Sequence, residues 1–185
     1  MTHISISENQ ASEVGLVILD VDGVLSDGGI YLWADADGTR CEAKRFDAQD
    51  GLAIKLLMWA GLEVIIVSGR YSAATAMRCE ELGVTECHQD PEARKLPLIT
   101  DLLERRGFEW GQVAMMGDDL ADVPVLRKVG LPIAVANAVP EVKEVAAAVT
   151  QLSGGRGAVR EFARGLLQAR GQWDTVLQEY YDARS

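Results

Sequence analysis

Continuous apolar runs of strand length alternate with helical patterns along most of the chain. The apolar runs predict six strands, at residues 15–21, 62–70, 84–88, 112–119, 131–137 and 146–152. The intervening patterns predict helices at about residues 50–61, 72–82 and 93–106, one opened by Asp122 and Pro124, and a closing helix at 157–171. Strands that are apolar on both faces and are joined through helices form a parallel sheet covered on both sides. The pattern therefore predicts an α/β fold, a Rossmann-like doubly wound parallel sheet.

Residues 28–46 interrupt this alternation. An apolar stretch from Ile30 to Trp33 is followed by a strand-like stretch around "ADADG", in which Asp37 and Gly38 form a hairpin turn signal. We expect a projecting β-hairpin here. Because no long repeat, low-complexity tract or linker is present, we expect residues 1–185 to form a single domain, with a core at about 14–171 and a short C-terminal tail at 172–185.

Composition and charge restrict the possible partners. The chain has 185 residues, is 48% hydrophobic and carries a formal net charge of −10. No window approaches the 18 or so uninterrupted apolar residues of a membrane span, and the polar start of the chain is unlike a signal peptide. We therefore expect a cytoplasmic protein with no membrane partner. The negative charge argues against nucleic-acid binding, but it leaves room for an anionic small molecule held by a local basic cluster.

Cysteines and histidines are too few to provide the usual metal or hydrolase chemistry. Cys41, Cys79 and Cys87 lack metal-ligand spacing and are interpreted as unpaired thiols. The only histidines are His3 and His88. This argues against a zinc site and against a Ser-His-Asp hydrolase.

Polar side chains follow three of the predicted strands at the point where each strand ends. Asp20, Ser68 and Asp118 stand in "LDVDG", "VSGR" and "GDDLAD". Because the functional crevice of an open parallel sheet lies at the carboxyl ends of its strands, we expect these residues at one edge. Asp22 is two residues beyond Asp20, and along a regular strand its side chain would lie on the same side.

These segments resemble the four motifs of the haloacid dehalogenase superfamily of phosphotransferases. The motifs correspond to "DVDGVLSDG", to Ser68 in "IIVSGR", to Lys95 at the start of a predicted helix, and to "GDDLAD". The resemblance spans about residues 16–167, nearly all of the chain.

The resemblance implies a Mg²⁺ cofactor. A carboxylate that attacks a negatively charged phosphate monoester needs a cation between the two groups, and magnesium prefers oxygen ligands. By resemblance, the ligands are the carboxylates of Asp20 and Asp118 and the backbone carbonyl of Asp22. Asp119 and Asp122 are expected to orient the metal shell or to cap the following helix.

The resemblance also implies catalytic roles. Asp20 is the nucleophile that forms an aspartyl-phosphate, which divides one difficult displacement into two. Asp22 protonates the leaving sugar oxygen and then takes a proton from the hydrolytic water. Ser68 and Lys95 bind the phosphoryl oxygens.

A finer resemblance is to the 3-deoxy-D-manno-octulosonate 8-phosphate phosphatases, enzymes on the route to bacterial surface sugars such as lipopolysaccharide. It is carried by "KRFDAQDGLAIKLL", "SGRYSAATAMRCEELGV", "GDDLADVPVLRKVGLPIAVANAVPEV" and "GGRGAVREF". The implied substrate is an acidic sugar phosphate, whose carboxylate suits the bidentate grip of arginine. The substrate-binding residues carried over are Asp22, Asp47, Ala48, Gln49, Asp50, Gly51, Lys55, Arg70, Arg78 and Lys95.

The chain has no room for the large cap domain of many superfamily members. Only a hairpin and a helix fit between the first and second motifs, and one helix and one strand fit between the second and third. Capless members of this kind commonly assemble as tetramers in which the hairpin helps to build the substrate cavity, so we expect a homotetramer. Arg156 and Arg160 are expected at a subunit interface or in a lid.

Two departures from the family pattern keep alternatives open. The loop "HQDPEARK" contains Asp90-Pro91 and an extra residue, and the hairpin is several residues longer. Both border the expected cavity, so a 9-phosphate phosphatase of a sialic-acid-like nine-carbon sugar is an alternative substrate assignment. A non-catalytic phosphatase-like module associated with sugar nucleotidyltransferases is another, although all four motifs are retained. A receiver-like signalling domain is disfavoured by Asp22.

Overall fold

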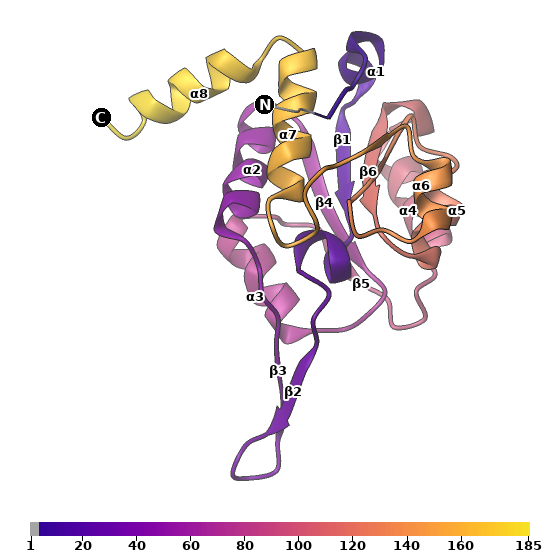
Figure 1. Cartoon of the computed structure of the whole chain (residues 1–185), viewed down its shortest axis with the longest axis vertical. Helices are drawn as coiled ribbons and strands as arrows, with labels where there is room; N and C mark the ends of the chain where they lie inside the picture. Colours follow the sequence, from indigo (N-terminus) through magenta and orange to yellow (C-terminus); the bar gives the residue numbers. More distant parts are fainter. Residues whose placement is uncertain (1–3) are drawn as a thin grey trace.

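The computed structural model describes residues 4–185, and its centre is a six-stranded parallel sheet (Figure 1). The strand order is β5-β4-β1-β6-β7-β8. The bounds are β1 Leu16–Leu19, β4 Glu63–Ser68, β5 Cys87–Gln89, β6 Val113–Gly117, β7 Leu131–Ala134 and β8 Ala148–Val149. All residues of β1 are buried, because β4 and β6 flank it on both sides and helices cover both faces. The predicted parallel sheet is confirmed.

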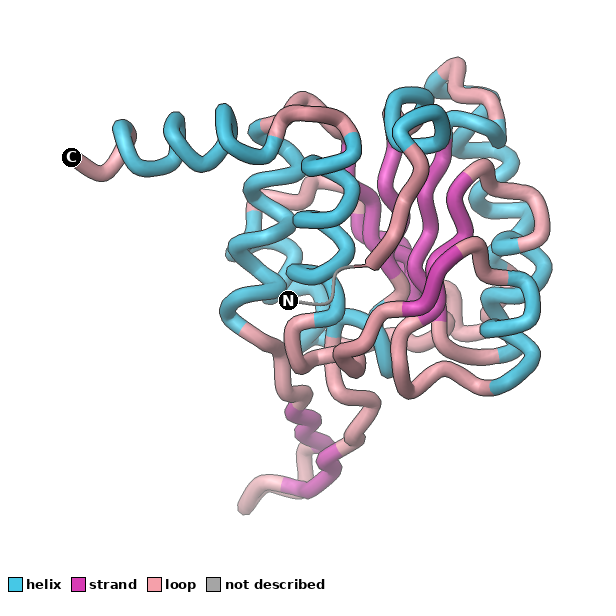
Figure 2. Tube along the Cα trace, turned by 45° about the horizontal axis from the view of Figure 1, so that its top comes forward, coloured by secondary structure: helices cyan, strands magenta, loops and turns pink. Residues whose placement is uncertain are grey.

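Two layers of helices sandwich the sheet (Figures 1 and 2). One layer contains α2 Ala48–Trp59, α3 Ala73–Leu82 and α7 Ala158–Ala169, and the other contains α4 Lys95–Arg106, α5 Val123–Leu126 and α6 Pro140–Val145. The longer helices bury apolar residues on the side that faces the sheet, such as Ile99, Leu102 and Leu103 of α4. The doubly wound α/β class predicted from the sequence is confirmed, and all the strands point their carboxyl ends at one edge.

The hairpin β2 Tyr31–Ala34 and β3 Arg40–Ala43 projects from that edge, at the bottom of Figure 1. Its turn is closed by the Asp35 carboxylate, which accepts hydrogen bonds from the amides of Asp37 and Thr39. The strand-like stretch expected around residues 34–38 is therefore mostly the turn itself, and the return strand comes after it. Within residues 4–185, the hairpin is the only insertion that adds strands outside the six-stranded sheet.

Both ends of the described chain hold helices that were not predicted. Near the start is α1 Glu8–Glu13, whose first turn is capped by the Ser7 side chain. The segment expected to be a short tail contains α8 Trp173–Asp182, which extends away from the body in Figure 1 and is anchored by buried Trp173. His3 lies outside the described residues. Of the helices in residues 4–185, none has the length and apolar character needed to cross a membrane.

Candidate active site

The carboxyl ends of β1 and β6 bring three carboxylates together. Asp20 follows β1, Asp118 follows β6, and Asp122 lies one short helical turn later; one carboxylate oxygen from each lies within 4.8 Å of the others. Asp20 and Asp122 are buried and Asp118 is half-buried. The predicted convergence of Asp20 and Asp118 is observed, and Asp122 joins them.

Lys95, the first residue of α4, neutralises part of this cluster. Its ammonium lies 2.5 Å from Asp20 Oδ1 and 2.6 Å from Asp122 Oδ1, and its side chain is 4% exposed. Burial alone lowers the pKa of Lys95, but the two carboxylates outweigh it and raise the pKa above its ordinary value. The ammonium is therefore a fixed positive charge at the site.

One ammonium does not offset three carboxylates. Burial, and next the charge of Asp122, raise the pKa of Asp20 to about 7, while Lys95 acts in the opposite direction. Burial and the neighbouring carboxylates raise the pKa of Asp118 to about 8. Crowded, buried carboxylates of this kind favour either protons or a bound cation.

Asp122 also shapes the loop after β6. Its Oδ2 accepts hydrogen bonds from the amides of Asp118, at 3.0 Å, and Asp119, at 3.4 Å. Asp119 is exposed and caps the following turn through the amide of Leu120. By contrast, Asp118 Oδ1 is buried and has no hydrogen-bond partner among residues 4–185. An unpaired carboxylate oxygen beside Asp20 suits an oxygen-preferring divalent cation.

The chain leaves β1 in a tight turn, Val21–Leu25 (η1), instead of continuing as a strand. Asp22 has φ −79° and ψ 107°, and Gly23 has φ 93°. A Cβ at Gly23 would lie 2.0 Å from Asp118 Oδ2, so only glycine fits this close approach. The strand geometry expected for Asp22 is therefore wrong, and its carboxylate is held by Lys44 at 2.5 Å instead of joining the three-carboxylate cluster.

Ser68 ends β4, next to β1, and is 1% exposed. Its hydroxyl donates to the carbonyl of Arg70 at 3.1 Å and accepts from the amide of Arg70 at 3.2 Å. This side chain thus closes the turn that leads out of β4, and it directs Arg70 toward the hairpin.

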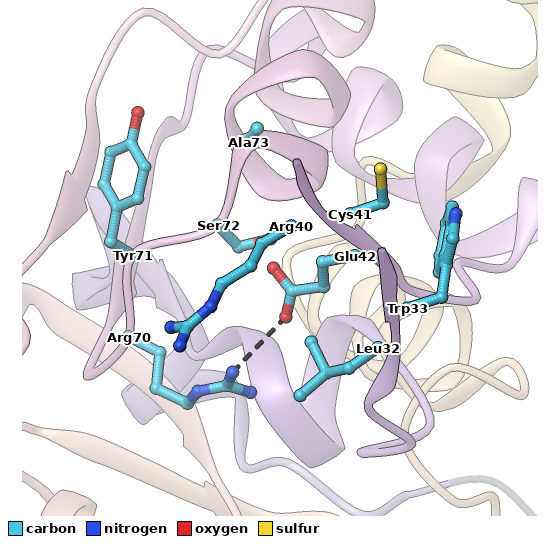
Figure 3. Close-up of a pocket in the computed structure, with 9 residues that line it drawn as sticks. All are labelled: Leu32, Trp33, Arg40, Cys41, Glu42, Arg70, Tyr71, Ser72 and Ala73. Carbon is cyan, nitrogen blue, oxygen red and sulfur yellow. Dashed lines mark hydrogen bonds and ion pairs between the residues drawn. The ribbon is translucent and has the colours of Figure 1, made fainter. Parts of the chain in front are cut away.

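A cavity of about 700 Å³ lies between the hairpin and residues 70–73 (Figure 3). Figure 3 shows Leu32 and Glu42 on the hairpin side that faces Arg70, with Trp33 and Cys41 on the other side. Arg70 Nη2 lies 3.4 Å from Glu42 Oε1, and Arg70 Nη1 lies 3.9 Å from Asp22 Oδ2. Arg70 Nη1 is buried and makes no hydrogen bond within the described part of the chain. Arg70 therefore lies between the cavity and Asp22, and its guanidinium has an N–H group that is still free to donate a hydrogen bond.

The predicted substrate region at residues 47–51 forms the start of α2. Asp47 caps the helix by accepting from the amide of Gln49 at 2.7 Å, and Ala48 and Gln49 are exposed. Lys55 is exposed on the second turn of α2. These side chains remain open to a ligand.

Asp50 has a different environment from the one predicted. Its side chain is fully buried and accepts hydrogen bonds from the amides of Gly157, at 3.1 Å, and Arg160, at 2.8 Å. Burial raises the pKa of Asp50 to about 6, although these amides oppose the shift. The carboxylate thus joins the start of α2 to the start of α7, which is a supporting position beneath the predicted contact surface.

Arg78 is also engaged by the protein. Its guanidinium donates to the carbonyl of Asp47 at 3.1 Å and pairs with Glu81 at 2.7 Å. A Cβ at Gly51 would lie 2.2 Å from Arg78 Nη2, so glycine makes room for this arginine. Arg78 therefore supports the 47–51 segment from below, rather than facing it as a free contact.

The two arginines of the "GGRGAVREF" segment are separated. Arg156 is exposed and lies 3.7 Å from Asp27 at the base of the hairpin. The guanidinium carbon of Arg160 lies 5.0 Å from the ring centre of Trp173, and its Nη1 is buried without a hydrogen bond. Arg156 borders the candidate site, while Arg160 packs under α8.

Two residues near the site were missed from the sequence. The Asn137 side chain donates to the carbonyl of Gly23 at 2.9 Å and accepts from the amide of Gly154 at 2.7 Å, which fixes the turn that carries Asp22. The other is Lys44, which pairs with Asp22. A signal for Lys44 exists, because it stands two residues after Glu42 and shares its face of an extended strand.

Comparison with known proteins agrees with this geometry. Residues 89–161 match the family of haloacid dehalogenase-like hydrolases. The 3-deoxy-D-manno-octulosonate 8-phosphate phosphatase KdsC of Escherichia coli K12 is 44% identical over 165 residues, which cover 89% of this chain and 85% of the relative. The chain belongs to the KdsC family. A second KdsC, from Salmonella typhi, is 42% identical and covers 94% of this chain and 88% of its own.

Solved structures of KdsC-type phosphatases share the fold. The Moraxella catarrhalis enzyme, in complex with magnesium ion, phosphate ion and KDO, matches with a TM-score of 0.86 at 35% identity over 94% of this chain and 97% of its own. The cobalt-bound Haemophilus influenzae enzyme matches with a TM-score of 0.81 at 36% identity over 89% and 93%. The family resemblance inferred from the sequence motifs is confirmed.

Proposed function

We propose that the chain is a magnesium-dependent phosphatase of 3-deoxy-D-manno-octulosonate 8-phosphate that works through an aspartyl-phosphate on Asp20. The observation that carries the proposal is the cluster of Asp20, Asp118 and Lys95 at the carboxyl edge of the sheet, in a chain 44% identical to KdsC. We also propose that residues 1–185 form a single domain from which the hairpin projects.

The donor set suits magnesium. The carboxylates of Asp20 and Asp118 and the backbone carbonyl of Asp22 would hold the ion, and the unpartnered Asp118 Oδ1 supplies a free ligand atom. When bound, the ion offsets the charge of the phosphate and of the carboxylates around it. Asp122 holds the Asp118 loop and Lys95 in place.

In the first step, an Asp20 carboxylate oxygen attacks phosphorus, and the bond from phosphorus to the sugar oxygen breaks. Asp22 gives its proton to that oxygen, so the sugar leaves as an alcohol. In the second step, water attacks the phosphorus and gives a proton to Asp22, and the bond from phosphorus to Asp20 breaks. Asp20 is free again, phosphate is released, and Asp22 is protonated for the next turnover.

Positive charge in the rest of the site suits an acidic sugar phosphate. Lys95 and Ser68 serve the phosphoryl oxygens, and Arg70 lines the hairpin cavity, where the exposed part of its guanidinium can take the sugar carboxylate. Lys55 and the exposed part of residues 47–51 complete the surface offered to the sugar.

We propose that the working form is a homotetramer that contains this hairpin at a subunit contact. Tyr31, Leu32 and Trp33 are each more than half exposed, and an isolated apolar strand pair invites association. The hairpin forms one wall of the cavity, so a neighbouring subunit packed against the hairpin would border the cavity. The cytoplasmic location expected from the composition stays a prediction.

A nine-carbon ulosonic acid 9-phosphate is the second candidate substrate. The observation that favours it is the long hairpin, which borders the cavity beside Arg70 through Leu32 and Glu42 (Figure 3). An eight-carbon and a nine-carbon acid share the carboxylate and differ in length, so the cavity wall decides between them.

Phosphate release tests both assignments. We expect the 8-phosphate to be hydrolysed only when Mg²⁺ is present, and Asp20→Asn to abolish turnover while circular dichroism stays unchanged. Asp174→Asn, a matched change of an exposed carboxylate on α8, should leave activity intact. Full activity of Asp20→Asn, or activity in excess chelator, would contradict the mechanism. A higher specificity constant for neutral hexose phosphates than for both acidic sugars would contradict the substrate class.

A further inference from the structure

The base of the hairpin places one lysine against the proposed acid/base residue. Lys44 follows β3, its side chain is 0% exposed, and its ammonium lies 2.5 Å from Asp22 Oδ1. An ammonium withdrawn from water costs several kcal/mol unless it is paired. Within residues 4–185, the only carboxylate within ion-pair distance of Lys44 is that of Asp22. The burial of this lysine is therefore explained by Asp22.

Asp22 in turn depends on Lys44 for its orientation. It stands in a turn with non-helical dihedral angles, just before a glycine with positive φ, so regular backbone structure does not fix its side chain. Across the described part of the chain, Lys44 is the sole hydrogen-bond donor to the Asp22 carboxylate. Arg70 Nη1 lies 3.9 Å from the other carboxylate oxygen, beyond hydrogen-bond range.

Carboxylates of the neighbouring three-carboxylate cluster are held differently. Asp20 and Asp122 share Lys95, and Asp122 also accepts two backbone amides. Because Lys95 and Lys44 serve separate carboxylates, the site contains two buried lysines with distinct tasks. One stands beside the proposed nucleophile, and the other stands beside the group that handles protons.

We propose that Lys44 is a positioning residue for Asp22, and this inference rests on the proposed function. It holds the carboxylate ready to take the proton of the water that hydrolyses the aspartyl-phosphate. A general base must lie within hydrogen-bond reach of its proton, and such groups contribute about 10²- to 10⁴-fold to rate. Lys44 contacts Asp22 and does not itself face the cavity beside Arg70. Because Lys44 directly follows β3, its contact with Asp22 also joins the base of the hairpin to the proposed acid/base residue.

The test removes the charge of Lys44 and separates the two chemical steps. Lys44→Met keeps a long side chain without the ammonium, and Lys128→Met is a matched control on an exposed lysine. With 4-nitrophenyl phosphate and Mg²⁺, whose leaving group needs no proton, we expect Lys44→Met to give a burst of about one nitrophenol per site. Steady turnover should then be about 10- to 100-fold slower than wild type, with KM changed less than about threefold. Lys44→Arg should recover part of kcat.

A double-mutant cycle with Asp22→Asn distinguishes positioning from general destabilisation. If Lys44 acts through Asp22, adding Lys44→Met to Asp22→Asn should not lower kcat further. The double variant lacks both charges of the Lys44–Asp22 pair, so it also serves if Lys44→Met alone fails to fold. A rise in KM at unchanged kcat, no burst, or additive losses in the cycle would each overturn the inference. Absence of phosphatase activity in wild type would instead refute the proposed function.

Discussion

Replacing Lys95 by methionine should destabilise the metal-free protein strongly. The side chain of Lys95 is 4% exposed and bridges Asp20 and Asp122, whose side chains are 6% and 1% exposed. Removing one partner of a buried ion pair leaves an uncompensated charge and costs about 3–5 kcal/mol. For a chain of this size, that corresponds to a loss of about 6 to 20 °C in melting temperature.

The loss should depend on pH and on magnesium. Near pH 8, Lys95→Met leaves three carboxylates with no buried cation. Near pH 5.5, Asp20 and Asp118 can take up protons because the pKa of each is raised, so the loss should be smaller. Magnesium supplies positive charge at the same cluster and should restore part of the stability. Lys128→Met, an exposed lysine on the protein surface, should change the melting temperature by no more than a degree or two.

Thermal melts followed by circular dichroism measure these differences. Wild type, Lys95→Met and Lys128→Met are compared at pH 8 and pH 5.5, each with chelator and with Mg²⁺. Equal melting temperatures for wild type and Lys95→Met at pH 8 in chelator would refute the reasoning, because the ammonium would then contribute nothing to the cluster. A loss that is the same at both pH values would refute the charge argument and leave only packing.

Three further outcomes follow from the geometry. Because the pKa of Asp20 and of Asp118 is raised to about 7 and 8 from 3.8, the folded metal-free protein retains protons that the unfolded chain loses. The free energy of unfolding should therefore fall from pH 5 to pH 8, and Mg²⁺ should stabilise the protein more at pH 8 than at pH 6. A melting temperature that does not change with pH would contradict this. Asp50→Asn should cost about 1–3 kcal/mol in urea unfolding, because its amide nitrogen faces a backbone donor. Arg70→Ala should raise KM about 10- to 100-fold for the acidic sugar phosphate and much less for an aryl phosphate, as measured by steady-state kinetics. An equal rise in KM for both substrates would argue against a contact between Arg70 and the sugar carboxylate.

The sheet and the edge that carries the site were predictable because their signals are local. The apolar runs of β1, β4 and β6 end in Asp20, Ser68 and Asp118, and parallel strands bring such ends together. The helix α8 had a readable signal too, since Trp173, Val176, Leu177 and Tyr180 follow helical spacing and pack on the core. The rest of the segment is polar, which makes this stripe narrow.

The remaining parts of the site depend on contacts between distant segments. Asp50 precedes a glycine at the start of a helix, and an aspartate at such a position can either contact a ligand at the surface or cap the helix. Its burial becomes visible only in the packing of α7 against α2. Lys44 reaches Asp22 because the hairpin folds back by a set number of residues, and sequence alone does not give that register. The roles assigned to these residues stay predictions until activity is measured.

The turn that carries Asp22 has a consequence for synthesis of the protein. Asn137 and Gly154 secure Gly23, so residues over 100 positions apart complete one small loop. Strand β1 also cannot complete its pairing until its neighbour β6, which ends at Gly117, has been synthesised. Contacts of such long sequence separation form late, after the intervening chain has left the ribosome. A nascent chain therefore exposes an apolar β1 and carries no finished catalytic loop until most of the protein is made, so phosphatase activity is confined to completed molecules.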